Sequence, residues 1–222
     1  MTKWGSSVIG AAALLAAALG GAPAGADPVC VPVHAGLDPK IWDVSRGPIS
    51  GDALGQVFLA EDTLITRLTV WRRPNNRSVI GAHLYITAVD TTWTPPIPVT
   101  RQILLDGPTL HVYDSDPPGQ LIAMPFVIDP PLALPHPGLY AFFLQPEDCD
   151  QGDAWEITAS DQNPYPYGIY WITGTALNSC YLHGVAGGGD NDDLIFDIEF
   201  CRPDATTPTL KSSWGRIKTI YR

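Results

Sequence analysis

The sequence predicts an all-β protein, a jelly-roll-like antiparallel β-sandwich that forms a single domain. About twelve short segments alternate apolar and polar residues at roughly ten-residue spacing, a pattern typical of sandwich strands. Turns rich in Gly, Pro and Asp separate these segments, and after the N-terminal leader no stretch keeps a helical period for about ten residues. The chain has no internal repeat, which disfavours a propeller or a solenoid.

Residues 1–26 are expected to form a secretory signal peptide that precedes the sandwich domain at 27–201. Lys3 supplies a basic start, an uncharged run spans Val8 to Leu19, and Ala24-Gly25-Ala26 fits the cleavage pattern. The run is shorter than the roughly 20 residues of a membrane-spanning helix, although an uncleaved anchor is the alternative. We therefore expect a mature protein without a membrane span that is secreted, extracellular or at the cell surface, with the periplasm as the alternative.

The charge of the chain restricts its partners. Asp and Glu outnumber Lys and Arg by 23 to 13, and the net charge is −10. Proteins that bind a nucleic-acid backbone use clustered Lys and Arg, so we expect no nucleic-acid partner. The same balance disfavours adsorption to anionic membranes.

The first half of the domain has the most regular alternation. From Ile80 to Ala88 every even-numbered residue is apolar, as in a half-buried strand. Thr91 to Pro98 contains three prolines, too many for a central strand, and is expected to be a loop. The strands expected in this half are Val29 to Ala35, Leu54 to Ala60, Leu64 to Trp71 and Val79 to Asp90.

In the second half the expected strands are shorter, and proline turns separate them. Turns are expected at Asp106 to Pro108, Asp114 to Gly119 and Asp129 to Pro131. Leu139 to Leu144 is apolar on both faces, which predicts a central strand that is covered on both sides. The strands expected in this half are Arg101 to Leu105, Thr109 to Tyr113, Leu121 to Ile128, Leu139 to Gln145, Trp155 to Ser160, Ile169 to Thr173 and a weak one at Leu177 to Leu182.

The last strand follows a glycine-rich acidic loop. Every even-numbered residue from Leu194 to Phe200 is apolar, while Asp193, Asp197 and Glu199 fall on the odd face. This period of two predicts that the even face contributes to the core and that the odd face is solvated.

Four cysteines, Cys30, Cys149, Cys180 and Cys201, follow the leader. An even count in an exported chain favours disulfides, and the chain has no CxxC pair that would indicate zinc. Four cysteines allow three connectivities, among which the sequence does not choose. We expect pairs between Cys30 and Cys201 and between Cys149 and Cys180, with reduced cysteines as the alternative.

Residues 202–222 are expected to be a basic linker and tail. Five Lys and Arg residues of this segment oppose a single acid, Asp204, and Trp214, Ile217 and Tyr221 fall at helical spacing. The tail is interpreted either as a sorting or docking signal or as a loosely packed terminus.

Several short patterns are typical of sandwich cores and turns: Gly55 to Ala60, Ile65 to Trp71, Leu84 to Thr87, Asp114 to Gly119, Ala154 to Ile157 and Asp193 to Phe196. Together they resemble exported bacterial β-sandwich domains of the choice-of-anchor type. The resemblance spans about Leu54 to Phe200 and implies a jelly-roll-like sandwich on a secreted or surface protein. It implies no catalytic residues, and the cysteine pairs and the proline-rich segment around Trp93 depart from it.

Two acidic clusters supply the oxygen ligands that Ca²⁺ prefers. Neither is an EF-hand, because the twelfth position lacks the required bidentate Glu. Because both clusters are rich in oxygen ligands, structural Ca²⁺ is the candidate cofactor. The alternative interpretation is that the clusters are solvated acidic turns. The candidate ligands are Asp190, Asn191, Asp192, Asp193, Asp148, Asp150 and Asp153.

An aromatic segment is the candidate ligand site. Tyr165 and Tyr167 stand in a loop bracketed by prolines, where they are hard to bury. Exported sandwiches commonly bind carbohydrate by stacking sugar rings on exposed aromatic side chains that polar groups flank. The candidate ligand-binding residues are Tyr165, Tyr167, Trp93, Tyr181 and His183.

The sequence contains no pattern typical of catalysis. Asp197 and Glu199 share one strand face, but such side chains lie roughly 7 Å apart and point the same way, which suits a solvated sheet better than a glycosidase. Nucleophile elbows, zinc-binding helices and phosphate loops are absent from the sequence. We expect a non-enzymatic binding or adhesion module with carbohydrate as the candidate ligand. The alternatives are a structural cell-envelope component, docked to another envelope protein through its tail, and, less favoured, a glycoside-active enzyme.

Overall fold

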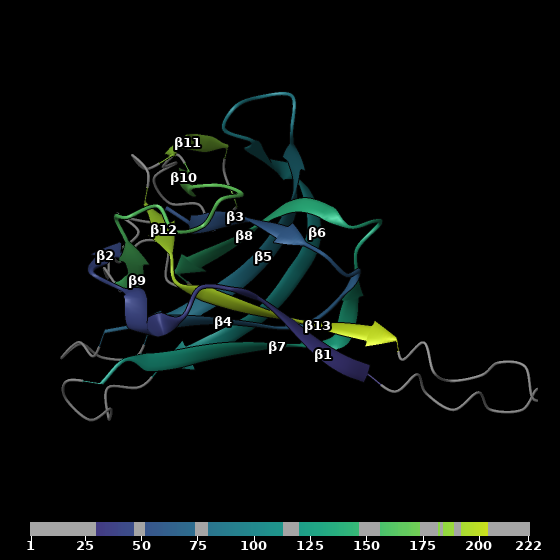
Figure 1. The fold of residues 1–222 in the computed structure, drawn as a ribbon, viewed down its shortest axis with the longest axis horizontal. Helices are drawn as coiled ribbons and strands as arrows, with labels where there is room; N and C mark the ends of the chain where they lie inside the picture. The colour runs from purple at the N-terminus through teal and green to yellow at the C-terminus, as the bar shows by residue number, and fades with distance from the viewer. Residues whose placement is uncertain are drawn as a thin grey trace, which may run out of the picture.

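The computed structural model is a β-sandwich of two antiparallel sheets (Figure 1). It describes residues 30–46, 52–73, 80–112, 120–146, 156–173, 182, 184–188 and 192–203. These residues contain one short 3-10 helix, η1 (Pro39–Ile41), and no α-helix. The all-β sandwich that the sequence predicts is confirmed. Within this part of the chain, no helix has the length and apolar character required to cross a bilayer.

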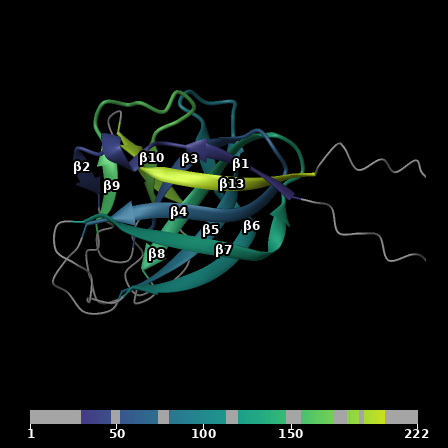
Figure 2. The same cartoon turned by 60° about the horizontal axis from the view of Figure 1, so that its bottom comes forward.

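The first sheet has seven strands, in the order β1-β13-β4-β9-β12, with β2 on β9 and β7 on β4. The second sheet has six, in the order β11-β10-β3-β8-β5-β6. Figure 2 shows β1, β13, β4 and β7 side by side in front of β5, β6 and β8. The strands are β1 (Cys30–Gly36), β2 (Val44–Arg46), β3 (Leu54–Ala60), β4 (Leu64–Arg72), β5 (Ile80–Asp90), β6 (Ile97–Val112), β7 (Ile122–Ala133), β8 (Gly138–Pro146), β9 (Ile157–Ser160), β10 (Tyr170–Thr173), β11 (Val185–Gly188), β12 (Asp193–Leu194) and β13 (Phe196–Pro203).

The strand pairs are nested along the chain. β1 pairs with β13, β2 with β9, β3 with β8, β4 with β7, and β5 with β6. Each pair encloses the next one in sequence, so the chain runs as one long antiparallel ribbon that is wound around the core. This winding is the arrangement of a jelly roll.

The core lies between the two sheets, and the last strand supplies much of it. All four even-numbered residues from Leu194 to Phe200 are fully buried. The ring of Phe196 lies 5.3 Å, centroid to centroid, from the ring of Phe142 on β8. The predicted apolar face of the last strand is therefore confirmed.

A second, smaller apolar cluster covers the other face of the second sheet. It is built on Val57, Ala141, Phe143 and Trp171, and Leu139 and Ile169 pack against it. Because β8 lies between β3 and β5 and is apolar on both faces, the prediction of a central, doubly covered strand is confirmed.

Two strands are longer than the sequence predicts. β6 is a single strand of 16 residues, where a turn is expected at Asp106 to Pro108. β7 continues through Asp129 to Pro131, another expected turn. Both strands lie at sheet edges, where a proline, which lacks an N–H, is tolerated. Register shifts between β5 and β6 and between β4 and β7 accommodate the irregular residues. Both turn predictions are therefore wrong.

The sequence also fails to predict β11. Val185–Gly188 is glycine-rich and has low strand propensity, yet it pairs with β10 at the edge of the second sheet. Of the weak strand expected at Leu177 to Leu182, only Leu182 lies among the described residues, and it is not in a strand.

The predicted disulfide between Cys30 and Cys201 is present and joins β1 to β13. It encloses a chain separation of 171 residues. Next to it, the guanidinium of Arg202 donates to the carboxylate of Asp62, with 2.7 Å from Nη2 to Oδ2. The expected signal peptide, the Cys149–Cys180 pair and residues 204–222 of the expected tail lie outside the described residues.

We predict that the double variant Cys30→Ala/Cys201→Ala unfolds with a free energy lower by about 2–5 kcal/mol, because the cross-link limits the entropy of the unfolded chain. Urea denaturation of the variant and of the oxidised wild type measures the difference. The control is the Cys149→Ala/Cys180→Ala variant, which leaves Cys30–Cys201 as the one possible bond; on reduction it should lose the same free energy. A loss below about 0.5 kcal/mol would show that the cross-link contributes little to stability.

Candidate ligand-binding cleft

A surface cleft of about 520 Å³ lies between two loops. One loop joins β5 to β6 and the other joins β9 to β10. Leu139 at the start of β8 contributes to the cleft, which therefore lies over the second apolar cluster. The lining residues are Thr91, Trp93, Thr94, Pro95, Pro96, Leu139, Asn163, Tyr165, Pro166, Tyr167, Gly168 and Ile169.

Three of the aromatic residues selected from the sequence meet at this cleft, but they are not equally accessible. Trp93 is 61 % exposed and Tyr167 is 45 % exposed. Tyr165 is only 6 % exposed, so the expectation that its ring is hard to bury is wrong. Tyr181 and His183, the other two candidates, lie outside the described residues.

Tyr165 is buried because it connects the cleft to the core. Its ring lies 5.1 Å from Phe196 and 5.5 Å from Tyr167, both in edge-to-face geometry. Its hydroxyl accepts a 2.9 Å hydrogen bond from the Leu59 N–H, and burial raises its pKa to about 12. Tyr165 therefore forms the floor beneath Tyr167 and is not an exposed stacking surface.

The loop that contains these tyrosines takes the place of a strand along β3. β10 pairs with β3 only from Leu54 to Gln56. Beyond that point the Val57 N–H donates to the Ile169 carbonyl at 3.5 Å, and the Leu59 N–H donates to Tyr165. The approach is close, because a Cβ on Gly168 would lie 2.6 Å from the Val57 Cβ. This position therefore requires glycine.

A buried polar pair holds the same loop from inside the sandwich. The Gln56 amide donates from Nε2 to Asp193 Oδ1 at 2.9 Å and to the Gly168 carbonyl at 3.2 Å. Its carbonyl oxygen accepts a 3.1 Å bond from the Leu194 N–H. The other carboxylate oxygen of Asp193 accepts a 2.7 Å bond from the Tyr165 N–H. The Gln56 amide and both Asp193 oxygens therefore have partners.

Asp193 corrects the expectation for the odd face of the last strand. Asp193 is fully buried, as is Ile195, because β12 ends at Leu194 and β13 begins at Phe196. The alternation therefore does not extend through Ile195 to Asp193. Burial raises the pKa of the Asp193 carboxyl to about 6, although hydrogen bonds from Tyr165 and Gln56 partly oppose this increase.

The loop between β5 and β6, which forms the opposite wall of the cleft, is held by hydrogen bonds to Asp90. Asp90 ends β5, and its Oδ1 accepts hydrogen bonds from the Thr92 N–H at 2.9 Å and from the Thr92 hydroxyl at 2.6 Å. These bonds, the hydroxyl bond above all, lower the pKa of Asp90. The turn that carries Trp93 is thus fixed by a local hydrogen-bonded motif.

The chemistry of the cleft is aromatic and uncharged. None of the described residues that line it is Asp, Glu, Lys, Arg or His. Thr91, Thr94 and Asn163, which carry hydroxyl and amide groups, line the cleft together with Trp93 and Tyr167. Such a surface suits a neutral ligand with an apolar face and polar edges.

Among the described residues, no three His, Cys, Asp or Glu side chains converge as metal ligands. Asp193, a candidate calcium ligand, directs both oxygens at hydrogen-bond donors. Asp192 is buried, and its carbonyl accepts from the Tyr170 N–H. Calcium binding stays a prediction, because the remaining candidate ligands lie outside the described residues: Asp190, Asn191, Asp148, Asp150 and Asp153.

The two carboxylates weighed for glycosidase chemistry have partners on neighbouring strands. Asp197 lies 2.9 Å from the Nδ1 of His34 on β1. Glu199 accepts a 2.9 Å hydrogen bond from the Thr66 hydroxyl and lies 3.5 Å from the Arg67 guanidinium on β4. These contacts link adjacent strands across the face of the first sheet.

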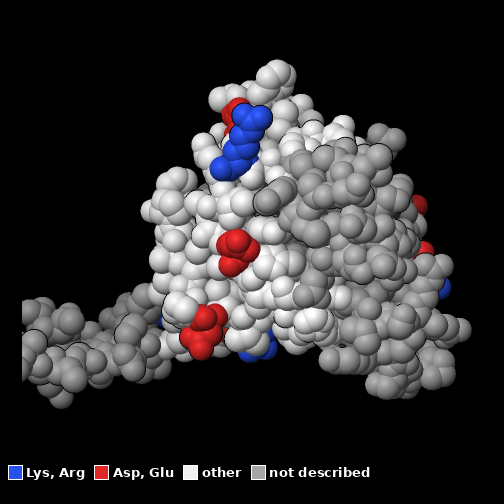
Figure 3. Space-filling model, turned by 180° about the vertical axis from the view of Figure 1, so that it is seen from behind, with Lys and Arg blue, Asp and Glu red and all other residues white. Residues whose placement is uncertain are grey.

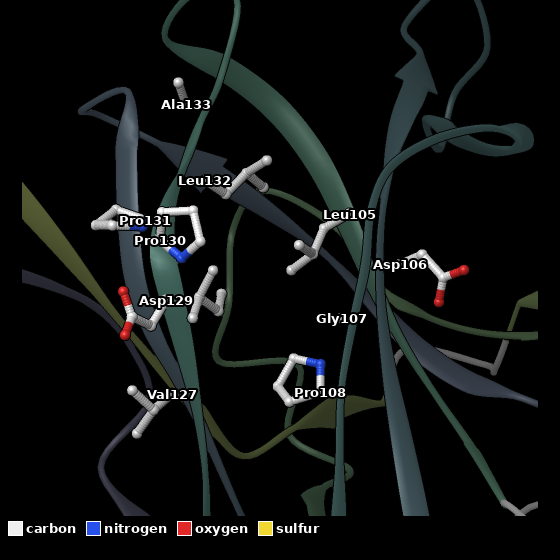
Figure 4. A pocket seen from close by; sticks show the side chains of 11 residues that line it. Leu105, Asp106, Gly107, Pro108, Val127, Asp129, Pro130, Pro131, Leu132 and Ala133 are labelled. Atoms are coloured by element: carbon white, nitrogen blue, oxygen red, sulfur yellow. The ribbon is translucent and has the colours of Figure 1, made fainter.

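A second groove, of about 490 Å³, lies between the edge strands β6 and β7. Figure 4 shows Leu105 directed toward β7, while Asp106 and Asp129 point away from the space between the strands. Asp106 instead contacts the Nε2 of His83 at 2.7 Å. The two carboxylates therefore do not converge in this groove.

Comparison with known proteins finds no matching family model, curated protein or solved structure. The geometry of the chain itself is therefore the basis for a functional conclusion.

Sequence reasoning selected the aromatic residues but missed the polar ones that position them. Gln56 was the detectable signal, since it is a polar residue among the apolar, inward-facing positions Leu54 and Phe58 of its strand. Its partner Asp193 lies 137 residues away, so the sequence contains no local indication of the pair.

We predict that Asp193→Asn changes how stability depends on pH. The Asp193 carboxyl ionises near pH 3.8 when unfolded and near 6 in the native protein, so its ionisation destabilises the native state above pH 6 by about 3 kcal/mol and has no such effect below pH 4. Because Asn does not titrate, the free energy of unfolding of the variant minus that of wild type should rise by this amount across the window. Urea denaturation at a series of pH values measures it, and a pH-independent difference would contradict the prediction.

Proposed function

We propose that this protein is a secreted or surface-associated, non-enzymatic binding module that takes a neutral carbohydrate in the cleft between its two loops. The observation that carries the proposal is the exposure of Trp93 and Tyr167 on one uncharged cleft. Exposed large aromatic side chains at a concave site are typical of ligand recognition.

Stacking explains why carbohydrate is the favoured ligand. A sugar ring has an apolar C–H face that packs on an aromatic ring, and its hydroxyl edge requires hydrogen-bonding groups. Thr91, Thr94 and Asn163 carry such groups and are among the lining residues. Because the described lining contains no cation, an anionic sugar would lose hydration without gaining a charged partner. The proposed ligand is therefore a neutral glycan.

Other features of the protein support an exported binding module. A disulfide such as Cys30–Cys201 is typical of oxidising compartments. Figure 3 shows no large cluster of Lys and Arg on the described surface of the face it displays, and a protein that binds a nucleic-acid backbone needs such a cluster. The expected signal peptide and the resemblance to exported sandwich domains support the same location.

We predict that Trp93→Ala and Tyr167→Ala each weaken glycan binding about tenfold or more, because each removes a stacking surface, and tenfold corresponds to about 1.4 kcal/mol. An array of neutral and uronic-acid oligosaccharides identifies the ligand, and titration calorimetry then measures the affinities. Trp42→Ala is the matched control, since Trp42 stacks with Arg73 at 5.3 Å and is not among the cleft-lining residues.

Two outcomes would reject the proposal. One is a wild-type chain that binds no neutral oligosaccharide on the array, which would favour the alternative of an envelope component docked through its tail. The other is glycan binding that both Trp93→Ala and Tyr167→Ala leave unchanged, with or without a loss in the Trp42→Ala control.

A further inference from the structure

We propose that Gln56 and Asp193 are positioning residues of the cleft: their buried side chains hold the loop from Tyr165 to Ile169 against β3 and thereby set the position of Tyr167. The inference concerns ligand binding only through the proposed function, on which that part rests. The positional part concerns the unliganded protein and is tested separately.

The first argument is that this loop has few backbone bonds to the strand on which it lies. Among the described residues, the Val57 and Leu59 N–H groups are the β3 backbone donors to this loop beyond the end of the β3–β10 pairing. The Val57 bond is long, at 3.5 Å, and the Leu59 bond ends on a side chain, the Tyr165 hydroxyl. A regular strand pair would supply a continuous ladder in their place.

The second argument is that the Gln56 and Asp193 side chains supply the missing bonds. The Asp193 carboxylate accepts a 2.7 Å hydrogen bond from the Tyr165 N–H, and the Gln56 amide donates a 3.2 Å hydrogen bond to the Gly168 carbonyl. The two bonds hold the loop on either side of Tyr167. Because Gln56 and Asp193 are fully buried and joined to each other at 2.9 Å, neither can follow the loop if it moves.

The third argument is that the loop position fixed by these two hydrogen bonds determines the shape of the cleft. Five of its described lining residues come from this loop, including Tyr167. The Tyr165 ring beneath Tyr167 is fixed at one end by its backbone bond to Asp193 and at the other by its hydroxyl. Loss of the Gln56 or Asp193 bonds would leave buried polar groups without partners, which the loop relieves by moving toward solvent.

The test uses the full chain and compares two disruptive variants with two matched controls. Gln56→Leu removes the amide at similar volume, and Gly168→Ala introduces a Cβ 2.6 Å from the Val57 Cβ. Thr158→Val is the control for Gln56, because Thr158 is also fully buried and the change removes the hydrogen bond from its hydroxyl to the Trp71 carbonyl. Gly187→Ala is the control for Gly168, because nothing lies within 4 Å of its new Cβ.

The ligand-free readout is the set of aromatic NMR resonances of Tyr167, assigned with the Tyr167→Phe variant. We expect Gln56→Leu and Gly168→Ala to shift these resonances and both controls to leave them unchanged, even where Thr158→Val costs comparable stability. Folded Gln56→Leu and Gly168→Ala variants with wild-type Tyr167 resonances would overturn the inference.

A reversed pair tests the inference where a single variant fails to fold. Gln56→Glu alone places a second carboxylate against Asp193. In Gln56→Glu/Asp193→Asn the introduced amide donates to the introduced carboxylate and still accepts from the Tyr165 N–H, while the Leu194 N–H keeps an acceptor. Only the Gly168 carbonyl loses its donor, so the double variant restores the bonds on the Tyr165 side of the loop. The double variant should therefore return the Tyr167 resonances toward wild type, and a double variant no closer than Gln56→Glu would contradict the inference.

Affinity for the neutral oligosaccharide identified on the array is the second readout. Gln56→Leu and Gly168→Ala should each reduce it at least about tenfold, and the controls less than about twofold. Shifted Tyr167 resonances in a protein that binds no glycan would support the positioning role and reject the proposed ligand. Unshifted Tyr167 resonances in variants that still bind the glycan would reject the positioning role and support the proposed ligand.

Discussion

The buried amide–carboxylate pair of Gln56 and Asp193 is the interaction on which the arrangement around the cleft depends. Gln56 lies on the second sheet and Asp193 on the first, so their 2.9 Å hydrogen bond crosses the interior between the sheets. A carboxylate in this position is costly unless donors surround it. Hydrogen bonds from the Tyr165 N–H and the Gln56 amide offset part of this cost, and they also attach the loop that forms one wall of the cleft.

Strand β3 has two roles, because it contributes to the core of the sandwich and also supports the loop of the cleft. On β3, the side chains of Leu54 and Phe58 belong to the main core, whereas Val57 belongs to the second cluster. Its position between β8 and β10 fixes it on both sides only as far as Gln56, and beyond that residue the loop replaces a neighbouring strand. Irregular backbone can lie beside a sheet edge in this way because side chains, in particular Tyr165 and Gln56, supply the hydrogen bonds that a strand would make. A binding surface is thereby added without an opening in the core.

Much of the fold could be predicted from alternation and turn residues. The apolar face of the last strand, the doubly covered β8 and the Cys30–Cys201 bond are as expected. The predicted turns at Asp106 and Asp129 are wrong because a proline, which lacks an N–H, interrupts a strand only where that N–H is needed for pairing, and an edge strand tolerates it. In the cleft, Trp93 and Tyr167 could be selected by type, whereas the burial of Tyr165 depends on its contact with Phe196.

The sequence by itself determined which residues of each strand face inward, because the period of two is a local property of extended backbone. It also determined that the cleft residues include aromatic side chains and no charge, since Thr91 to Pro96 and Asn163 to Ile169 contain no charged residue wherever they lie. Only the tertiary structure decided that the loop after β5 meets the loop after β9, that Tyr165 is the floor while Tyr167 is exposed, and that Asp193 is buried. These outcomes follow from pairings between residues more than a hundred positions apart, such as Gln56 with Asp193 and Leu59 with Tyr165. Non-local packing of this kind leaves no periodic signal in the chain.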